Sequence, residues 1–197
     1  SASRTDVTVA SSVGTTTGTS AGPTTGSTGT SSGDNCSDQA KLVYVVDENN
    51  TFSSFDPSTS PPSFHDIGTL NCPDNSGSPF SMAVDRNATA WVLYSNSKIF
   101  KVNTATLGCT ATSFASNNGF STFGMGFVSN VAGGTTDTLF VAASGKLGTL
   151  NTSTLKATKV GSFTGQPELT GTGSAQLWGF FPDTSPAKIA QLSVTDA

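Results

Sequence analysis

The sequence predicts an all-β repeat protein that follows an N-terminal polar tail. Short apolar runs alternate with polar turns from residue 40 onward, and no window keeps the 3.6-residue period of a helix. The same apolar unit also recurs at a nearly constant interval, which is typical of repeat architectures.

The repeat is clearest in a strand that ends on a small polar residue. The anchors Asp56, Asn103, Asn151 and Ser193 are separated by 47, 48 and 42 residues. This spacing is close to the roughly 40 to 50 residues of one β-propeller blade. The four aligned strands cover residues 51–56, 98–103, 146–151 and 188–193, and each follows a more apolar run, at 42–46, 91–94, 139–142 and 177–181.

Further strands complete the predicted blades. First strands are expected at 82–84, 125–127 and 168–170, and outer strands at 67–70, 110–114 and 159–163. The first repeat lacks a first strand and the fourth lacks an outer strand, so we expect about 3.5 blades of four-stranded antiparallel sheet.

Propellers typically close with four to eight blades, so an incomplete count needs an explanation. An N-terminal strand could complete a small four-blade ring, further blades could be missing from this chain, or two chains could join. The repeat domain, residues 36–197, ends just after an anchor, which favours a C-terminally incomplete domain.

Residues 1–35 form the polar tail. From Gly14 to Gly33 almost every residue is Gly, Ser or Thr, which is typical of a flexible linker or stalk. Before it, residues 5–13 predict a β-strand with Val7, Val9 and Val13 on one face. Pairing within the chain is the commoner arrangement, whereas addition of this strand to a neighbouring chain would build an oligomer or filament.

Composition restricts the location and the partners. Charged residues make up 11% of the chain, against roughly 25% in typical soluble proteins, so Ser, Thr, Asn and Gly supply most of its polarity. Such a neutral polar surface is common in secreted β proteins. The net charge is -4 and the basic residues are scattered, so we expect no nucleic-acid partner. No apolar run approaches the roughly 20 residues of a transmembrane segment.

The three cysteines match no zinc motif. Cys36, Cys72 and Cys109 are widely spaced, and the single histidine, His65, cannot complete a metal site. In an oxidising compartment we expect one disulfide and one remaining thiol, with three possible pairings. Cys72 with Cys109 is favoured, because both flank repeat strands while Cys36 lies at the tail junction.

Motifs for catalysis or metal binding are weak. His65 lies in a Pro-rich turn, where a solvated loop residue is the simpler interpretation than a catalytic base. Residues 47–51 and 85–89 resemble the start of a calcium loop but lack its later Gly and Glu, so Asx turns explain them better. We therefore expect no catalytic or metal-binding residues and no cofactor. The inner-strand aromatic residues are expected to pack in the core: Trp91, Trp178, Phe180 and Phe181.

Residues 44–47, 55–57, 79–86 and 123–127 resemble segments of secreted propeller-type lipoproteins of myxobacteria. The resemblance covers residues 36–197, and the Ser/Thr/Gly stretch is similar to their surface stalk. It implies a propeller fold, an extracellular or outer-surface location, and pairing of Cys72 with Cys109. It carries over no catalytic residues.

These observations favour a non-catalytic secreted or cell-surface module for binding or extracellular assembly. Its partners would be copies of itself, other surface proteins or glycans. The alternative is a propeller enzyme of the lyase, hydrolase or dehydrogenase type, with its active site on blades or loops that the sequence does not identify.

Overall fold

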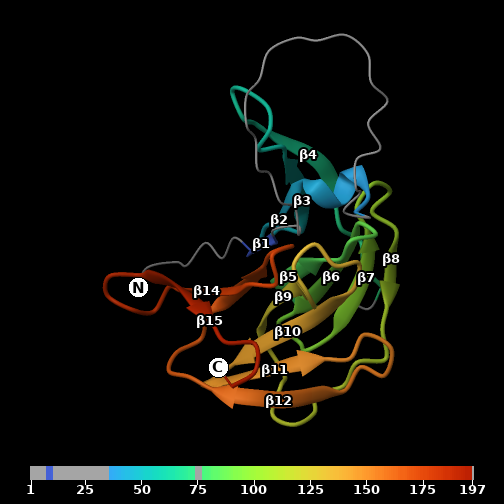
Figure 1. Cartoon of the computed structure of the whole chain (residues 1–197). Coiled ribbons are helices and arrows are strands. Elements are labelled where there is room, and N and C mark those ends of the chain that lie inside the picture. The colour runs from blue at the N-terminus through green and yellow to red at the C-terminus, as the bar shows by residue number, and fades with distance from the viewer. Residues whose placement is uncertain (1–7, 11–35, 74–76, 197) are drawn as a thin grey trace, which may run out of the picture.

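Four antiparallel sheets follow one another along the chain in the computed structural model, which describes residues 8–10, 36–73 and 77–196 (Figure 1). Sheet 1 contains β1 (Thr8–Ala10), β2 (Val43–Val46), β3 (Thr51–Phe55) and β4 (Phe64–Thr69). Sheet 2 contains β5 (Pro79–Val84), β6 (Thr89–Tyr94), β7 (Ile99–Asn103) and β8 (Cys109–Ala111). Sheet 3 contains β9 (Gly124–Ser129), β10 (Asp137–Ala143), β11 (Lys146–Leu150) and β12 (Ala157–Ser162). Sheet 4 contains β13 (Glu168–Gly171), β14 (Leu177–Phe181) and β15 (Lys188–Leu192).

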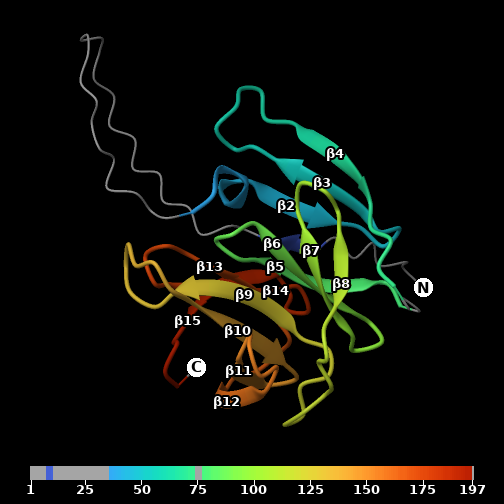
Figure 2. The same cartoon turned by 90° about the vertical axis from the view of Figure 1, so that its right-hand side faces the viewer.

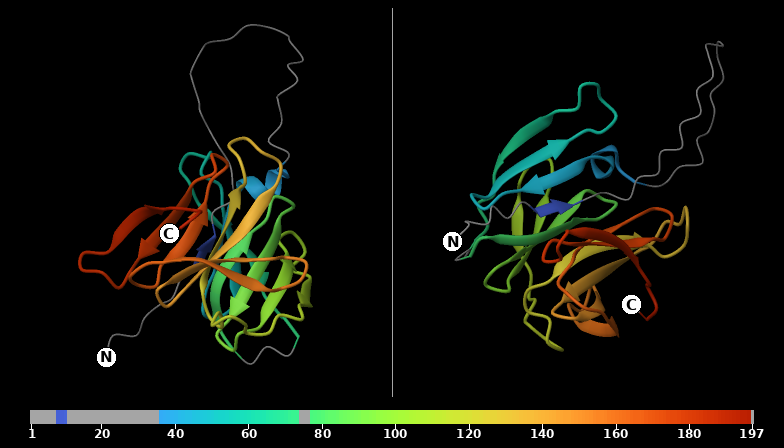
Figure 3. Two further views of the ribbon diagram at one scale, coloured as in Figure 1. Left: turned by 60° about the horizontal axis from the view of Figure 1, so that its bottom comes forward. Right: turned by 90° about the vertical axis from the view of Figure 1, so that its left-hand side faces the viewer.

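The sheets are arranged as consecutive blades of a propeller. Each is an antiparallel meander in which neighbouring strands pair in chain order. The innermost strands lie side by side, since β5 contacts both β1 and β9, and β13 contacts β9. Figures 2 and 3 show the four sheets fanned out in this order. The predicted all-β, propeller-like fold is therefore confirmed.

All fourteen strands expected after residue 40 are present, with small shifts of their ends. The expectation of an outer strand at 110–114 was partly wrong, because β8 ends at Ala111 and Phe114 turns into the core instead. The sequence also did not predict η1 (Asp38–Lys41), a single turn of 3₁₀ helix. The Ser37 side chain caps this turn by accepting a hydrogen bond from the backbone N–H of Ala40.

The N-terminal segment supplies the strand that the first repeat lacks. Strand β1 pairs antiparallel with β2 of the same chain, with Val9 opposite Val45, and so becomes the innermost strand of sheet 1. Only Thr8–Ala10 of the predicted strand 5–13 is described. Val7, Val13 and the linker 14–33 lie outside the described residues.

The hydrophobic core consists of three clusters, each between two consecutive sheets. Sheets 1 and 2 share a cluster around Tyr44, Phe52 and Phe100, and sheets 3 and 4 share one around Phe140 and Leu177. Strand side chains alternate between the two faces, so the central strands of sheets 2 and 3 contribute to two clusters at once. This explains why β6 and β10 read as nearly continuous apolar runs.

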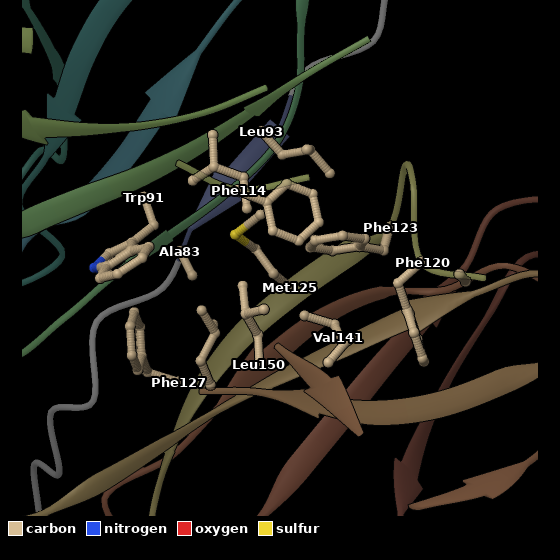
Figure 4. Packing of buried hydrophobic residues seen from close by; sticks show 14 residues of the cluster. Ala83, Trp91, Leu93, Phe114, Phe120, Phe123, Met125, Phe127, Val141 and Leu150 are labelled. Carbon is tan, nitrogen blue, oxygen red and sulfur yellow. The ribbon is translucent and has the colours of Figure 1, made fainter. Parts of the chain in front are cut away.

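The cluster between sheets 2 and 3 is the largest and contains many aromatic rings (Figure 4). Trp91 meets Phe127 edge-on, with 6.4 Å between the ring centroids. Phe114 and Phe120, from the connection between β8 and β9, both contact Phe123 edge-on. Aromatic pairs in this geometry contribute about 0.5–1.5 kcal/mol beyond the area that they bury.

Sheets 2 and 3 are also joined by a buried ion pair. The Arg86 Nε donates to Asp137 Oδ2 at 2.7 Å, and an Arg86 Nη2–H donates to the other oxygen of the same carboxylate. Ser129 Oγ donates to Asp137 Oδ1 at 3.1 Å. The Arg86 and Asp137 side chains are only 12% and 6% exposed, so this two-pronged contact is shielded from solvent.

Cys72 and Cys109 form a disulfide, as predicted, with Cα atoms 5.2 Å apart. Cys72 lies in the connection between sheets 1 and 2, and Cys109 begins β8, the outer strand of sheet 2. The bond closes a segment of sequence separation 37, and Cys36 takes no part in it.

Replacing both Cys72 and Cys109 by Ala should lower the free energy of unfolding by about 2–4 kcal/mol, because the unfolded chain then loses a covalent restraint. Urea titration followed by circular dichroism measures this difference. Dithiothreitol should lower the stability of the wild-type chain to that of the variant and leave the variant unchanged. Equal stability of the oxidised wild type and the variant would contradict this expectation.

Substitution of Asp137 by Ala should cost about 3–5 kcal/mol, because it leaves the Arg86 guanidinium buried without its carboxylate. The matched control is Asp38→Ala, which removes the exposed Lys41–Asp38 pair and should cost less than about 1 kcal/mol. Thermal unfolding of both variants beside the wild type makes the comparison. Similar costs for the two substitutions would show that the Arg86–Asp137 pair does not hold the sheets together.

Candidate functional site

The two segments that resemble calcium loops are hairpin turns. Asp47 Oδ1 accepts hydrogen bonds from the backbone N–H groups of Asn49 and Thr51 at 2.9 and 2.7 Å. Asp85 Oδ1 accepts the equivalent bonds from Asn87 and Thr89 at 2.9 and 3.0 Å. These carboxylates are Asx-turn acceptors, as the sequence predicted, and they fix the registers of β2–β3 and β5–β6.

Hydrogen bonding also changes the acidity of these turns. Desolvation by itself would raise the pKa of Asp47, but the donated hydrogen bonds from Thr51 and Asn49 outweigh it and hold that pKa below its ordinary value. Hydrogen bonds from the Ser58 hydroxyl and backbone N–H lower the pKa of Asp56 in the same way. Both carboxylates are therefore ionised at neutral pH and accept hydrogen bonds from backbone N–H groups.

The repeat anchors have a similar structural role. The Asn103 side-chain oxygen accepts from the N–H groups of Ala105 and Thr106, and Asn151 repeats this with Ser153 and Thr154. Each turn then reverses at a leucine with positive φ, 58° at Leu107 and 57° at Leu155. The recurring Thr-x-Thr-Leu sequence is thus explained by turn geometry.

His65 lies in β4, the outer strand of sheet 1, opposite Ser54, and is exposed. Within residues 8–10, 36–73 and 77–196, no group of three or more His, Cys, Asp or Glu side chains is placed to hold a metal ion. The same ranges contain no helix long and apolar enough to cross a membrane.

One carboxylate reaches the centre of the fan, where the innermost strands meet. Ser81 Oγ on β5 donates to Glu168 Oε2 on β13 at 3.0 Å and accepts from the Met125 N–H on β9 at 3.1 Å. Gly124 permits this contact, because a Cβ at that position would collide with the backbone of Pro167. The hydroxyl and the carboxylate tie three sheets together.

The repeat alignment assigns each sheet two distinct faces. We call the face turned towards the next sheet along the chain the trailing face, and the opposite one the leading face. Three aligned positions define the trailing face of each sheet. Two lie on the second strand, two residues apart, and the third lies on the third strand, opposite the later of these two. They are Tyr44, Val46 and Phe52 in sheet 1; Trp91, Leu93 and Ile99 in sheet 2; Phe140, Ala142 and Leu147 in sheet 3; and Trp178, Phe180 and Ile189 in sheet 4.

Burial of these positions changes abruptly at the last sheet. In sheets 1, 2 and 3 none of the nine side chains is more than 6% exposed. In sheet 4 Phe180 is 45% exposed, Ile189 is 69% exposed and Trp178 is half-buried. The same kinds of residue therefore occupy the same positions, but in sheet 4 the next sheet that would cover them is absent from the described residues.

The leading face of sheet 1 is uncovered at the other end of the fan. Val43, Val45 and Phe55 are only half-buried there, and Phe64 is 64% exposed. Phe55 and Phe64 pack on each other with their ring centroids 5.2 Å apart. Sheet 4 does not cover this face, because its three strands make no extended contact with those of sheet 1 in the described part of the chain.

The candidate functional site is therefore the apolar trailing face of sheet 4. The expectation that Trp178 and Phe180 would be core residues was wrong for this structure, although it was right for Trp91 and Phe181. Apolar strands in a repeat look alike whether or not a neighbour covers them. One sequence signal for this exposure was the position of the residue among the repeats. Ile189 aligns with Phe52, Ile99 and Leu147, which are buried, but it lies in the last repeat of the given sequence.

Comparisons with known proteins return structural neighbours only, since no family model and no curated protein matches the chain. One neighbour is a protein of unknown function from Bacteroides thetaiotaomicron, with a TM-score of 0.49 and 14% identity over 73% of this chain. Another is the extracellular domain of a hybrid two-component system from the same species, with a TM-score of 0.41 and 14% identity over 78% of this chain. A third is BamB from Moraxella catarrhalis, with a TM-score of 0.33 and 12% identity over 81%. The chain spans 42%, 20% and 63% of these three proteins, respectively.

Proposed function

We propose that this chain is a non-catalytic β-propeller module that associates with another protein through the trailing face of sheet 4. The observation that carries the proposal is the exposure of Phe180 and Ile189 at positions that are buried in every preceding sheet. Fully burying a side chain of this kind contributes about 1.5–3 kcal/mol, so the face offers several kcal/mol to a partner that covers it.

The polar residues support a module that binds rather than one that catalyses. Asp47, Asp85 and Asn103 hold turns, and Asp137 pairs with Arg86 between two sheets. Glu168 is hydrogen-bonded to Ser81. These side chains already stabilise the fold, whereas no sheet in the described part of the chain covers the trailing face of sheet 4.

The proposed location is outside the cytoplasm. The Cys72–Cys109 disulfide supports it, because disulfides persist in oxidising compartments and are rare in the cytosol. The low charge content and the resemblance to secreted myxobacterial lipoproteins point the same way. The N-terminal strand β1 pairs with β2 of its own chain. The association proposed here therefore uses a sheet face instead of strand addition.

Ile189→Asp should abolish association of the chain with any protein partner, because it places a charge in the centre of the apolar face. Sedimentation velocity of the fluorescently labelled chain, alone and with extracytoplasmic proteins of its source, measures the association. Val131→Asp is the matched control, because Val131 is 63% exposed in the β9–β10 connection, outside the trailing face. Association that survives Ile189→Asp, or that Val131→Asp removes equally, would refute the proposed function.

A further inference from the structure

We infer that Asn87, at the tip of the β5–β6 hairpin, is the acceptor of an N-linked oligosaccharide. This inference rests on the location outside the cytoplasm that forms part of the proposed function, and it adds a modification site to it. Asn87, Ala88 and Thr89 match the acceptor sequence Asn-x-Ser/Thr, in which x is any residue except proline. Sites of this kind lie in surface loops of secreted proteins.

Three acceptor sequences begin within the described residues, at Asn49, Asn87 and Asn151. All three asparagines are exposed, so their side-chain partners have to distinguish them. The Asn151 side-chain oxygen accepts hydrogen bonds from two backbone N–H groups of its own turn, at 3.0 and 2.8 Å. The Asn49 side chain is hydrogen-bonded to the Asp47 carboxylate. At these two positions, therefore, the turn itself explains the asparagine.

The turn does not explain Asn87. The Asp85 carboxylate accepts from the backbone N–H groups of Asn87 and Thr89, and the Ala88 N–H donates to the Asp85 carbonyl at 3.0 Å. These contacts use only the backbone of Asn87. Its side chain makes no hydrogen bond to residues 8–10, 36–73 or 77–196, so the amide is available for a modification that the fold does not oppose.

The residues on either side hold Asn87 in this exposed position. The Arg86 side chain pairs with Asp137 of sheet 3, and the carbonyl of the buried Ala88 accepts a hydrogen bond of 2.9 Å from the Thr104 hydroxyl. The hairpin tip lies between β5 and β6 and not on a sheet face, so an attached sugar leaves the packing between sheets intact. It would also add a bulky, solubilising group to a chain with only 11% charged residues.

The transfer uses an oligosaccharide carried on a lipid diphosphate and a transferase of the source. The Asn87 Nδ2 forms a bond to the anomeric carbon of the sugar, and the bond from that carbon to the diphosphate oxygen breaks. The lipid diphosphate leaves with the electron pair, and the amide nitrogen loses one of its two protons. The backbone N–H of Asn87 does not react, so its hydrogen bond to Asp85 and the turn are retained.

Peptide mapping by mass spectrometry tests the inference on the chain recovered from the extracytoplasmic fraction of its source. The peptide that contains Asn87 should carry the added mass of an oligosaccharide. Asn87→Gln removes the acceptor amide and Thr89→Ala removes the hydroxyl of the acceptor sequence, so each should abolish this added mass. Thr89→Ser keeps the hydroxyl and should retain it. Asn151→Gln is the matched control and should leave the modification of Asn87 unchanged. Circular dichroism confirms that each variant is folded.

The possible failures are distinguishable from failure of the proposed function. An unmodified Asn87 in the extracytoplasmic chain overturns the inference, whatever the state of Asn49 and Asn151, and so does an added mass that survives Thr89→Ala. Neither result affects the association through sheet 4, which Ile189→Asp tests separately. A chain recovered from the cytoplasm would refute the proposed location and this inference together.

Discussion

Face-to-face packing between consecutive sheets is the constraint on which the rest of the structure depends. A β-sheet with apolar residues on both faces is stable in water only when both faces are covered, and each sheet here obtains cover from its neighbours. Sheets 2 and 3 are covered on both sides and hold most of the strand residues that have no exposed surface, such as Val92, Leu93 and Val141. Within the described residues, sheets 1 and 4 each have a neighbouring sheet on one side, and the exposed large aromatic residues, Phe64 and Phe180, lie on the opposite sides.

The polar residues in the turns support this packing by fixing the register of the hairpins. A hairpin whose register slipped by one residue would turn every side chain to the opposite face, so the turns must fix the register to keep trailing and leading residues on their own faces. The carboxylates of Asp47 and Asp85 and the amides of Asn103 and Asn151 do this by binding the backbone N–H groups of their own turns. The Asx turns at Asp47 and Asp85 and the anchors Asn103 and Asn151 therefore help to keep the two apolar faces of each sheet distinct.

Most of the fold could be predicted from the sequence because its signals are local. Apolar runs and Asx turns located the strands, and the spacing of the anchors Asp56, Asn103, Asn151 and Ser193 gave the blades. The position of β1 was left open between pairing within the chain and pairing between chains, since sequence does not show which distant edge a strand joins. The exposure of Phe180 and Ile189 was missed for a related reason. Whether an apolar residue is buried depends on what lies opposite it, and the residues of sheet 4 resemble those of sheets that have a neighbour.

Sheet 1 differs from the other sheets in how it has to assemble. Sheets 2, 3 and 4 are each made from a contiguous stretch of chain, so their hairpins can close over short loops. Strand β1, in contrast, ends at Ala10 and pairs with a strand that begins at Val43. Closing so long a loop costs conformational entropy before any contact repays it, and such non-local pairing slows folding. Because β1 precedes β2 in the chain, it is synthesised earlier but can pair only after β2 has been made.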